Sequence, residues 1–296
     1  MNSDSRISMA ISFPEFPAPM SALWELLASY LDQYGCLPRK WMVLDPTANP
    51  DKYIPLADVT SAVDRIQTVI GRQRFTVMTF YPKGTEISFA LSHSLHPATK
   101  EPDGFHLGLT YGKGTTVPPG WNGLIEAIME RFPSYGGRQW STPYVAWQGC
   151  GEEDSYARFF GPVPKGFRRR QGPSLDGMTP GRILLDTSKN PGRFPSGPSN
   201  RFRAAPADLW LGPHFWDYAP CTKEEVLAAD FFLEKRDTPH FLYLKSWPHP
   251  FTRPDGEQGR VQQKLWRLLF HEDCEWPPGS GGISDVPVGG PPELMP

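Results

Sequence analysis

The chain has 296 residues, is 39% hydrophobic and 13% aromatic, and contains ten Trp, which excludes a wholly disordered protein despite 34 Pro and 28 Gly. Its formal net charge of −2 excludes a global field that would attract nucleic acid or an acidic membrane. Neither a signal-peptide pattern nor an apolar run of membrane-spanning length is present, so the sequence predicts a cytoplasmic protein. The four cysteines are expected to be free thiols: Cys36, Cys150, Cys221 and Cys274.

The first part of the chain is expected to form helices separated by short apolar segments. An extended, Pro-rich lead is expected over residues 1–19. From Ser21 to Gly35, apolar residues recur at i, i+3, i+4, i+7 and i+8, which predicts an amphipathic helix with its cap and its stop. Residues 41–44 are expected to form a strand or a covering segment. A second amphipathic helix is predicted from about residue 58, with Gly71 at its C-terminal end.

Three consecutive segments then carry strand patterns. Residues 75–81 are rich in β-branched and aromatic side chains, and residues 86–92 and 105–111 alternate between apolar and polar side chains. This period of two predicts an antiparallel β-meander with one buried face, which another part of the chain must cover. The two helices before the meander and a third one after it, which runs to Phe132 and is stopped by Pro133, can provide this cover.

The second half of the chain has a different composition. Residues 161–205 carry nine basic residues against two acids, with Gly and Pro throughout, and are predicted to form a long irregular connection. Thr222 and Glu225 form a capping box that opens a helix toward Phe231. Two further strands are predicted over residues 182–186 and 240–244, and a last helix over residues 260–270.

Together these elements predict an α+β fold, in which an antiparallel β-meander is covered by amphipathic helices and joined to a second, smaller α+β half by long Gly/Pro-rich loops. The first α+β unit is expected over residues 20–160. The basic connection over residues 161–205 then leads to the second unit over residues 206–275. The last segment, residues 276–296, has little capacity to pack and is predicted to be a flexible tail.

No spacing of residues in the sequence supports a catalytic constellation. His93 and His96 follow a predicted strand, but a catalytic zinc needs a third protein ligand, and neither Cys nor an acid stands at a telling spacing. Cys150 lies between two glycines, without a neighbouring His that would lower its pKa. The glycine-rich stretch over residues 111–116 lacks the spacing of a phosphate-binding loop. We therefore expect no enzyme, no bound metal and no cofactor.

The basic connection is also a candidate nucleic-acid surface. Positive charge interleaved with aromatic side chains is what a single-stranded nucleic acid binds, and Phe167, Phe194 and Phe202 are the aromatics available for stacking. The chain as a whole is slightly acidic, and basic loops rich in Gly and Pro are often solvated connectors. Direct binding of nucleic acid is therefore not expected, although this alternative stays open.

The order of the elements resembles that of a known family. A leading Leu-rich helix, the strand-like Lys40–Leu44, a second helix, a β-meander, and the Asp208–Pro213 stretch followed by a strand and a terminal helix are similar to the immunity protein 52 family. The resemblance covers residues 20–275 in layout. In place of the family's Gly-x-Trp signature, the chain has Gly120-Trp121 and Gly137-Arg-Gln-Trp140.

The resemblance implies a function and a partner. Members of this family are cytosolic α+β antidotes encoded beside restriction-endonuclease-like nuclease toxins, and the chain is most similar to the type that protects pseudomonads against a type VI secretion toxin. An antidote needs a surface complementary to its toxin and no catalytic site. The implied partner is therefore a cognate nuclease toxin, neutralised by covering its active cleft or by disturbing its assembly.

The candidate toxin-binding residues are acids that would mimic phosphate against a basic cleft and Trp side chains that would anchor the complex if they are exposed. They are Glu152, Glu153, Asp154, Glu101, Asp103, Trp147 and Trp121. Two alternatives remain open. One is a hydrolase or transferase whose site is assembled from distant residues, with His93, His96 and Cys150 as the first candidates. The other is a nucleic-acid-binding adaptor that uses the basic connection.

Overall fold

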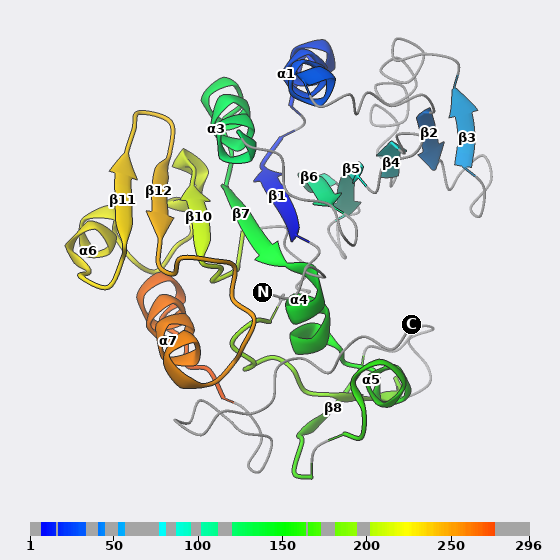
Figure 1. Ribbon diagram of the computed structural model, residues 1–296, viewed down its shortest axis with the longest axis vertical. Coiled ribbons are helices and arrows are strands. Elements are labelled where there is room, and N and C mark those ends of the chain that lie inside the picture. The colour runs from blue at the N-terminus through cyan, green and yellow to red at the C-terminus, as the bar shows by residue number, and fades with distance from the viewer. Residues whose placement is uncertain are drawn as a thin grey trace.

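The fold is built on one sheet of ten antiparallel strands, which are labelled in Figure 1. The computed structural model describes residues 7–15, 17–33, 41–44, 53–56, 77–80, 87–95, 102–111, 120–163, 165–172, 181–193 and 202–275. In sheet order the strands are β11 (Glu234–Asp237), β12 (Leu242–Lys245), β10 (Asp208–Leu211), β7 (Gly136–Ser141), β1 (Ile7–Phe13), β6 (Pro102–Tyr111), β5 (Ile87–Leu95), β4 (Val77–Phe80), β2 (Trp41–Leu44) and β3 (Tyr53–Leu56). The expected meander is confirmed as β4, β5 and β6, which pair antiparallel in chain order.

The helices and a small ribbon complete the α+β fold that the sequence predicts. The helices are α1 (Met20–Gln33), α3 (Trp121–Arg131), α4 (Thr142–Gly149), α5 (Glu153–Phe160), α6 (Lys223–Ala228) and α7 (Gly256–Phe270), with a 3₁₀ turn at Pro213–Phe215. Strands β8 (Arg169–Gln171) and β9 (Ile183–Leu185) pair with each other outside the main sheet. No helix in these described ranges is long and apolar enough to cross a membrane.

Helices cover both faces of the sheet, with α1 and α3 on one side and α4 and α7 on the other, whereas α5 lies farther from the sheet, beside β8 (Figure 1). On the first side, the odd residues Met9, Ile11 and Phe13 of β1 enter one core with the apolar stripes of α1 and α3. Because Gly137 of β7 has no side chain, Ile125 and Met129 of α3 approach the sheet closely; a Cβ at that position would lie 3.1 Å from Ile125. We call α1 and α3 the helix layer.

The second side has a separate core, in which strands β10 and β12 pack against α7. The residues that meet there are Leu209, Leu211, Leu242, Leu244, Leu265, Trp266 and Leu269. Trp210, between two of these leucines in the sequence, points to the opposite face and belongs to the helix-layer core. Strand β10 is therefore buried at all four positions, because both faces of the sheet are covered at that point.

The main sheet contains strands from both of the units that the sequence predicts. Strand β7 of the first unit pairs with β10 of the second, so the strands of both units form one continuous sheet. The extended lead contains β1, which lies between β6 and β7 rather than outside the fold. Its odd residues are apolar and its even residues small, a strand pattern that the prolines directly after it obscure.

Several local predictions are confirmed and others need correction. The capping box is present, with the Thr222 backbone N–H donating to Glu225 at 2.7 Å. Its helix ends at Ala228 rather than near Phe231, and Lys235 of β11 donates to the carbonyl of Ala229 at 2.9 Å beyond that end. Helices α4 and α5 lie in a part of the first unit for which the sequence patterns predict no element. The predicted helix from residue 58 and the tail over residues 276–296 lie outside the described residues.

Candidate protein-binding surface

The acidic run at the start of α5 is paired with arginines from the basic connection. Glu152 accepts a hydrogen bond from Arg182 at 2.9 Å, and Glu153 accepts two from Arg169, the shorter at 2.8 Å. Hydrogen bonding to the Arg169 guanidinium lowers the pKa of Glu153. The two candidate surfaces that appear separate in sequence, one acidic and one basic, thus meet in space.

The segment after α7 supplies a second group of acids, which pair with other arginines of the basic connection. Arg193, buried except for 3% of its side chain, donates to Glu272 at 2.8 Å. Arg203 also pairs with Glu272, and Arg168 pairs with Glu275. We call these nine residues the ion-pair belt: Glu152, Glu153, Glu272, Glu275, Arg168, Arg169, Arg182, Arg193 and Arg203.

The ion-pair belt weakens the case for two binding surfaces, the basic connection as a nucleic-acid surface and the acidic run at the start of α5 as a phosphate mimic. Five of the nine basic residues in the connection are paired with acids of the same chain, so much of its positive charge is neutralised. Phe167 and Phe202, the described aromatics that would stack with bases, are 2% and 1% exposed. Glu152 and Glu153 likewise face arginines of their own chain, which competes with the phosphate mimicry expected of them.

The two tryptophans that would anchor a partner if they were exposed are buried, so neither meets the condition for that role. Trp121 is 3% exposed and packs in the helix-layer core, where its ring lies 6.3 Å from that of Tyr30. Trp147 is 5% exposed and donates its indole N–H to the Tyr156 hydroxyl at 2.9 Å. Burial removes the large apolar surface of both rings from water, as is usual for aromatic side chains.

The other candidate residues are scattered. Asp154 is exposed in the first turn of α5, where its negative charge interacts favourably with the helix dipole. Asp103 lies in β6, and Glu101 lies outside the described residues. His93 lies in β5, whereas its expected neighbour His96 also lies outside the described residues. Among the residues that the structure describes, no three His, Cys, Asp or Glu side chains gather as a metal site would need.

The three described cysteines are free thiols, as expected. Burial raises the pKa of Cys221 and of Cys274 to about 11 and also raises the pKa of the half-buried Cys150. A thiol with a raised pKa has less thiolate at neutral pH, whereas a catalytic nucleophile needs more. The environment of Cys150 thus gives the hydrolase or transferase alternative no activated nucleophile at this position.

These pKa shifts predict slow thiol alkylation in the folded protein. At pH 8, Cys150 is expected to react with iodoacetamide several-fold more slowly than a thiol in a short peptide, and Cys221 and Cys274 only after unfolding. The rates are measured by mass spectrometry of the individual cysteine peptides, with the urea-unfolded protein as the control. Fast labelling of Cys150 in the folded protein would contradict its burial-raised pKa.

A small, partly open pocket lies between β7, α4 and α7. Its volume is about 30 Å³, which is the space of one water molecule. Arg138, Arg193 and Tyr144 are among the residues that line it. Burial lowers the pKa of Arg138 to about 9, because a charged guanidinium loses its hydration there. The enclosed part of this pocket is too small for an organic substrate.

The outer surface of the helix layer is a larger and different feature. An open groove of about 360 Å³ runs between the two helices, lined by Ala22, Glu25 and Leu26 from α1 and by Ala127, Glu130 and Arg131 from α3. Glu25 and Glu130 are exposed, whereas Leu26 is partly buried and packs against the core below. An apolar floor between charged edges is the usual anatomy of a protein interface.

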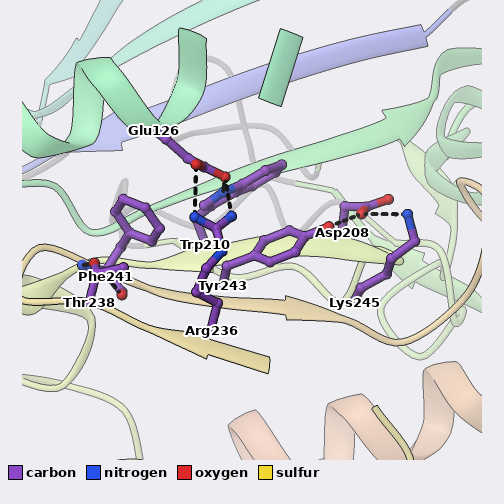
Figure 2. A network of polar contacts seen from close by, with 8 residues as sticks. All are labelled: Glu126, Asp208, Trp210, Arg236, Thr238, Phe241, Tyr243 and Lys245. Carbon is purple, nitrogen blue, oxygen red and sulfur yellow. Dashed lines mark hydrogen bonds and ion pairs between the residues drawn. The ribbon is translucent and has the colours of Figure 1, made fainter. Parts of the chain in front are cut away.

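A network of polar contacts fixes α3 to the edge of the sheet, as Figure 2 shows. The Glu126 carboxylate of α3 accepts hydrogen bonds from both terminal guanidinium nitrogens of Arg236 in β11, one of them at 2.9 Å. It also accepts one from the indole N–H of Trp210 in β10 at 3.2 Å. A bidentate pair of this kind fixes orientation as well as distance. Helix α3 is therefore held on one flank by this network, while its other flank borders the groove.

A second group in Figure 2 links the neighbouring strands β10 and β12. The Tyr243 hydroxyl donates to Asp208 at 2.7 Å, and the Lys245 ammonium lies 3.5 Å from the same carboxylate oxygen. Burial raises the pKa of Asp208, and burial together with this carboxylate raises the pKa of Tyr243. A carboxyl and a phenol that both resist ionisation form a structural link rather than a nucleophile with its base.

The sequence analysis did not select the groove, although part of its signal is present there. On the polar faces of α1 and α3, acids occur as Glu25, Asp32, Glu126 and Glu130, against the single base Arg131. Counting charges on the polar faces of the two predicted helices would have found this excess. The two faces lie side by side because β1, which precedes α1, pairs with β7, which follows α3.

The comparisons with known proteins give little further information. No family model and no curated protein matches the chain. Among solved structures, a similar one is the T6SS protein PA0821 of Pseudomonas aeruginosa, with a TM-score of 0.49 and 11% sequence identity. The match covers 90% of this chain and 74% of that one. A similarity at this level does not indicate a shared function.

Proposed function

We propose that this protein is an immunity protein, which binds a cognate secreted nuclease toxin in the cytoplasm of the producing bacterium and neutralises it. The observation that carries the proposal is the acidic outer surface of the helix layer. There, Glu25, Asp32 and Glu130 are exposed and Arg131 is the only exposed base of either helix. The resemblance of the chain to the immunity protein 52 family supports the same function.

The physical argument rests on charge complementarity. A nuclease binds a polyanion, so the surface that holds its substrate carries Lys and Arg. An acidic surface on the partner accelerates association with such a nuclease and selects against wrong partners. The ion-pair belt is less suited to this task, because its acids already face arginines of the same chain. In this proposal the protein acts by binding and not by catalysis.

Two measurements test the proposal. Cells that produce the nuclease encoded beside this gene are expected to grow only when the immunity protein is co-produced. The two purified proteins are expected to form a complex by calorimetry, with an affinity that falls as salt is raised, because opposite charges meet. If the purified toxin does not bind at micromolar concentration and growth is not restored, the proposal is wrong.

The mode of neutralisation is decided by a third measurement. Covering the active cleft is expected to abolish cleavage of DNA while the oligomeric state of the toxin stays unchanged. Disturbing the assembly is expected to change the mass of the toxin particle, measured by light scattering in the presence and absence of the immunity protein.

A further inference from the structure

We infer that the groove between α1 and α3 receives an amphipathic helix of the partner, with small or apolar residues along its centre and Lys or Arg on both sides. This inference rests on the proposed function and specifies how the toxin is held. Helices commonly present an apolar stripe to a groove on a partner protein, and a groove between two helices matches the shape of a third.

The floor of the groove suits the close approach of a helix. Ala22 of α1 and Ala127 of α3 are small and partly exposed, and Leu26 offers apolar surface next to them. Small side chains at the contact shorten the distance at which two helices pack. The groove volume of about 360 Å³ accommodates several side chains of an incoming helix.

The edges of the groove select a basic occupant. Glu25 comes from α1 and Glu130 from α3, so one exposed carboxylate stands on each helix that borders the groove. An incoming helix thus meets negative charge from both helices, and basic residues on both sides of its apolar stripe would pair with them. Arg131 follows Glu130 in the last turn of α3 and favours an acid at that end of the occupant.

Charge also argues against two other occupants, a second copy of the chain and its last segment. A second copy would place Glu25 and Glu130 against acids of the same kind, which is repulsive. The tail over residues 276–296 contains Asp285 and Glu293 but neither Lys nor Arg, so it offers no basic residue for the groove. A basic segment of the partner fits the groove better than either of these two.

The groove is preorganised on the side of α3. The ion pair of Glu126 with Arg236 and the packing of Ile125 and Ile128 into the core hold the helix in place before any partner arrives. On the side of α1, Leu23 and Leu27 do the same. A groove that needs no rearrangement loses less conformational entropy when it binds.

The inference is tested with the purified toxin encoded beside this gene and two double variants of equal charge change. Glu25→Lys with Glu130→Lys reverses the groove edges, and Glu152→Lys with Glu153→Lys reverses the acids of the ion-pair belt. We expect the groove variant to bind at least about 30-fold more weakly and the belt variant to stay within about 3-fold of the wild type. Circular dichroism and thermal melting of both variants establish that they are folded.

A third variant tests the floor without changing charge. Ala127→Gln places a longer side chain at a partly exposed helical position that tolerates it, and is expected to weaken binding by about 10-fold by occupying the groove. Its matched control is Ala228→Gln, an exposed alanine at the end of α6 on another part of the surface, for which binding is expected to be unchanged.

The outcomes separate this inference from the proposed function. If the wild type binds the toxin and both groove variants bind equally well, the inference is overturned while the immunity function stands. If the belt variant loses binding instead, the partner meets the ion-pair belt and the inference is likewise overturned. If the wild type does not bind, the proposed function fails, and the groove assignment that rests on it fails too.

Discussion

Trp210→Ala is expected to lower the free energy of unfolding by about 3–5 kcal/mol, the cost of deleting a large buried aromatic side chain. Trp210 is fully buried, its ring lies 4.9 Å from that of Tyr243, and its indole N–H reaches Glu126. The substitution removes this packing and one of the hydrogen bonds to the Glu126 carboxylate, which holds α3 in place. Urea denaturation followed by fluorescence and circular dichroism measures the change.

Trp210→Phe is the matched control for this prediction. It keeps an aromatic ring against Tyr243 and loses mainly the hydrogen bond to Glu126, so it is expected to cost clearly less than the alanine substitution. Equal losses for the two variants would show that the hydrogen bond and not the packing dominates. A loss below about 1 kcal/mol for Trp210→Ala would contradict the role of this residue in the core.

Gly212→Ala is expected to be at least as damaging, with a loss of about 3 kcal/mol or more, because the position leaves no space for a methyl group. A Cβ there would lie 2.1 Å from the backbone oxygen of Ser134. The backbone cannot move away easily, since Gly212 also donates to the carbonyl of Tyr135 at 3.0 Å. This contact joins the ends of β7 and β10, where the two halves of the sheet meet.

The control for Gly212→Ala is the same substitution at Gly123. Gly123 lies inside α3, is exposed, and leaves open space for a methyl group, with no neighbouring atom within 4 Å of a Cβ at that position. Alanine there is expected to raise the free energy of unfolding by about 0.5–1 kcal/mol, because the unfolded chain loses freedom and the helix gains a better former. Both changes are measured in the same denaturation series. If Gly212→Ala were also neutral, the backbone would have to relax by a route that its hydrogen bonds do not suggest.

The elements that the sequence predicts well are those whose signal lies within a few residues. The apolar spacing of α1 and α3 and the alternation at Phe105 and Leu107 of β6 record which face of each element is buried. The capping box of α6 is equally local, since it needs only Thr222 and Glu225. For these elements, burial and local hydrogen bonding act in the same direction.

Other elements have weak local signals and form because of their neighbours. Strand β11 is a run of four exposed charged residues, Glu234–Asp237, without alternation, and it becomes a strand by pairing with the edge of β12. Strand β7 begins with two glycines, which are poor strand formers in isolation. They are accepted there because α3 on one side and Phe202 on the other come too close for a side chain.

The candidate site shows the same division. The sequence establishes that the acids and the basic connection exist, and that two early helices carry acidic polar faces. Only the tertiary structure decides which charges neutralise one another, because Glu153 and Arg169 are 16 residues apart and Arg193 and Glu272 are 79 apart. It likewise decides that Trp121 and Trp147 are buried and that α1 and α3 border a common groove. Periodicity is a local property of the chain, whereas pairing of charges and the shape of a surface depend on which distant segments the sheet brings together.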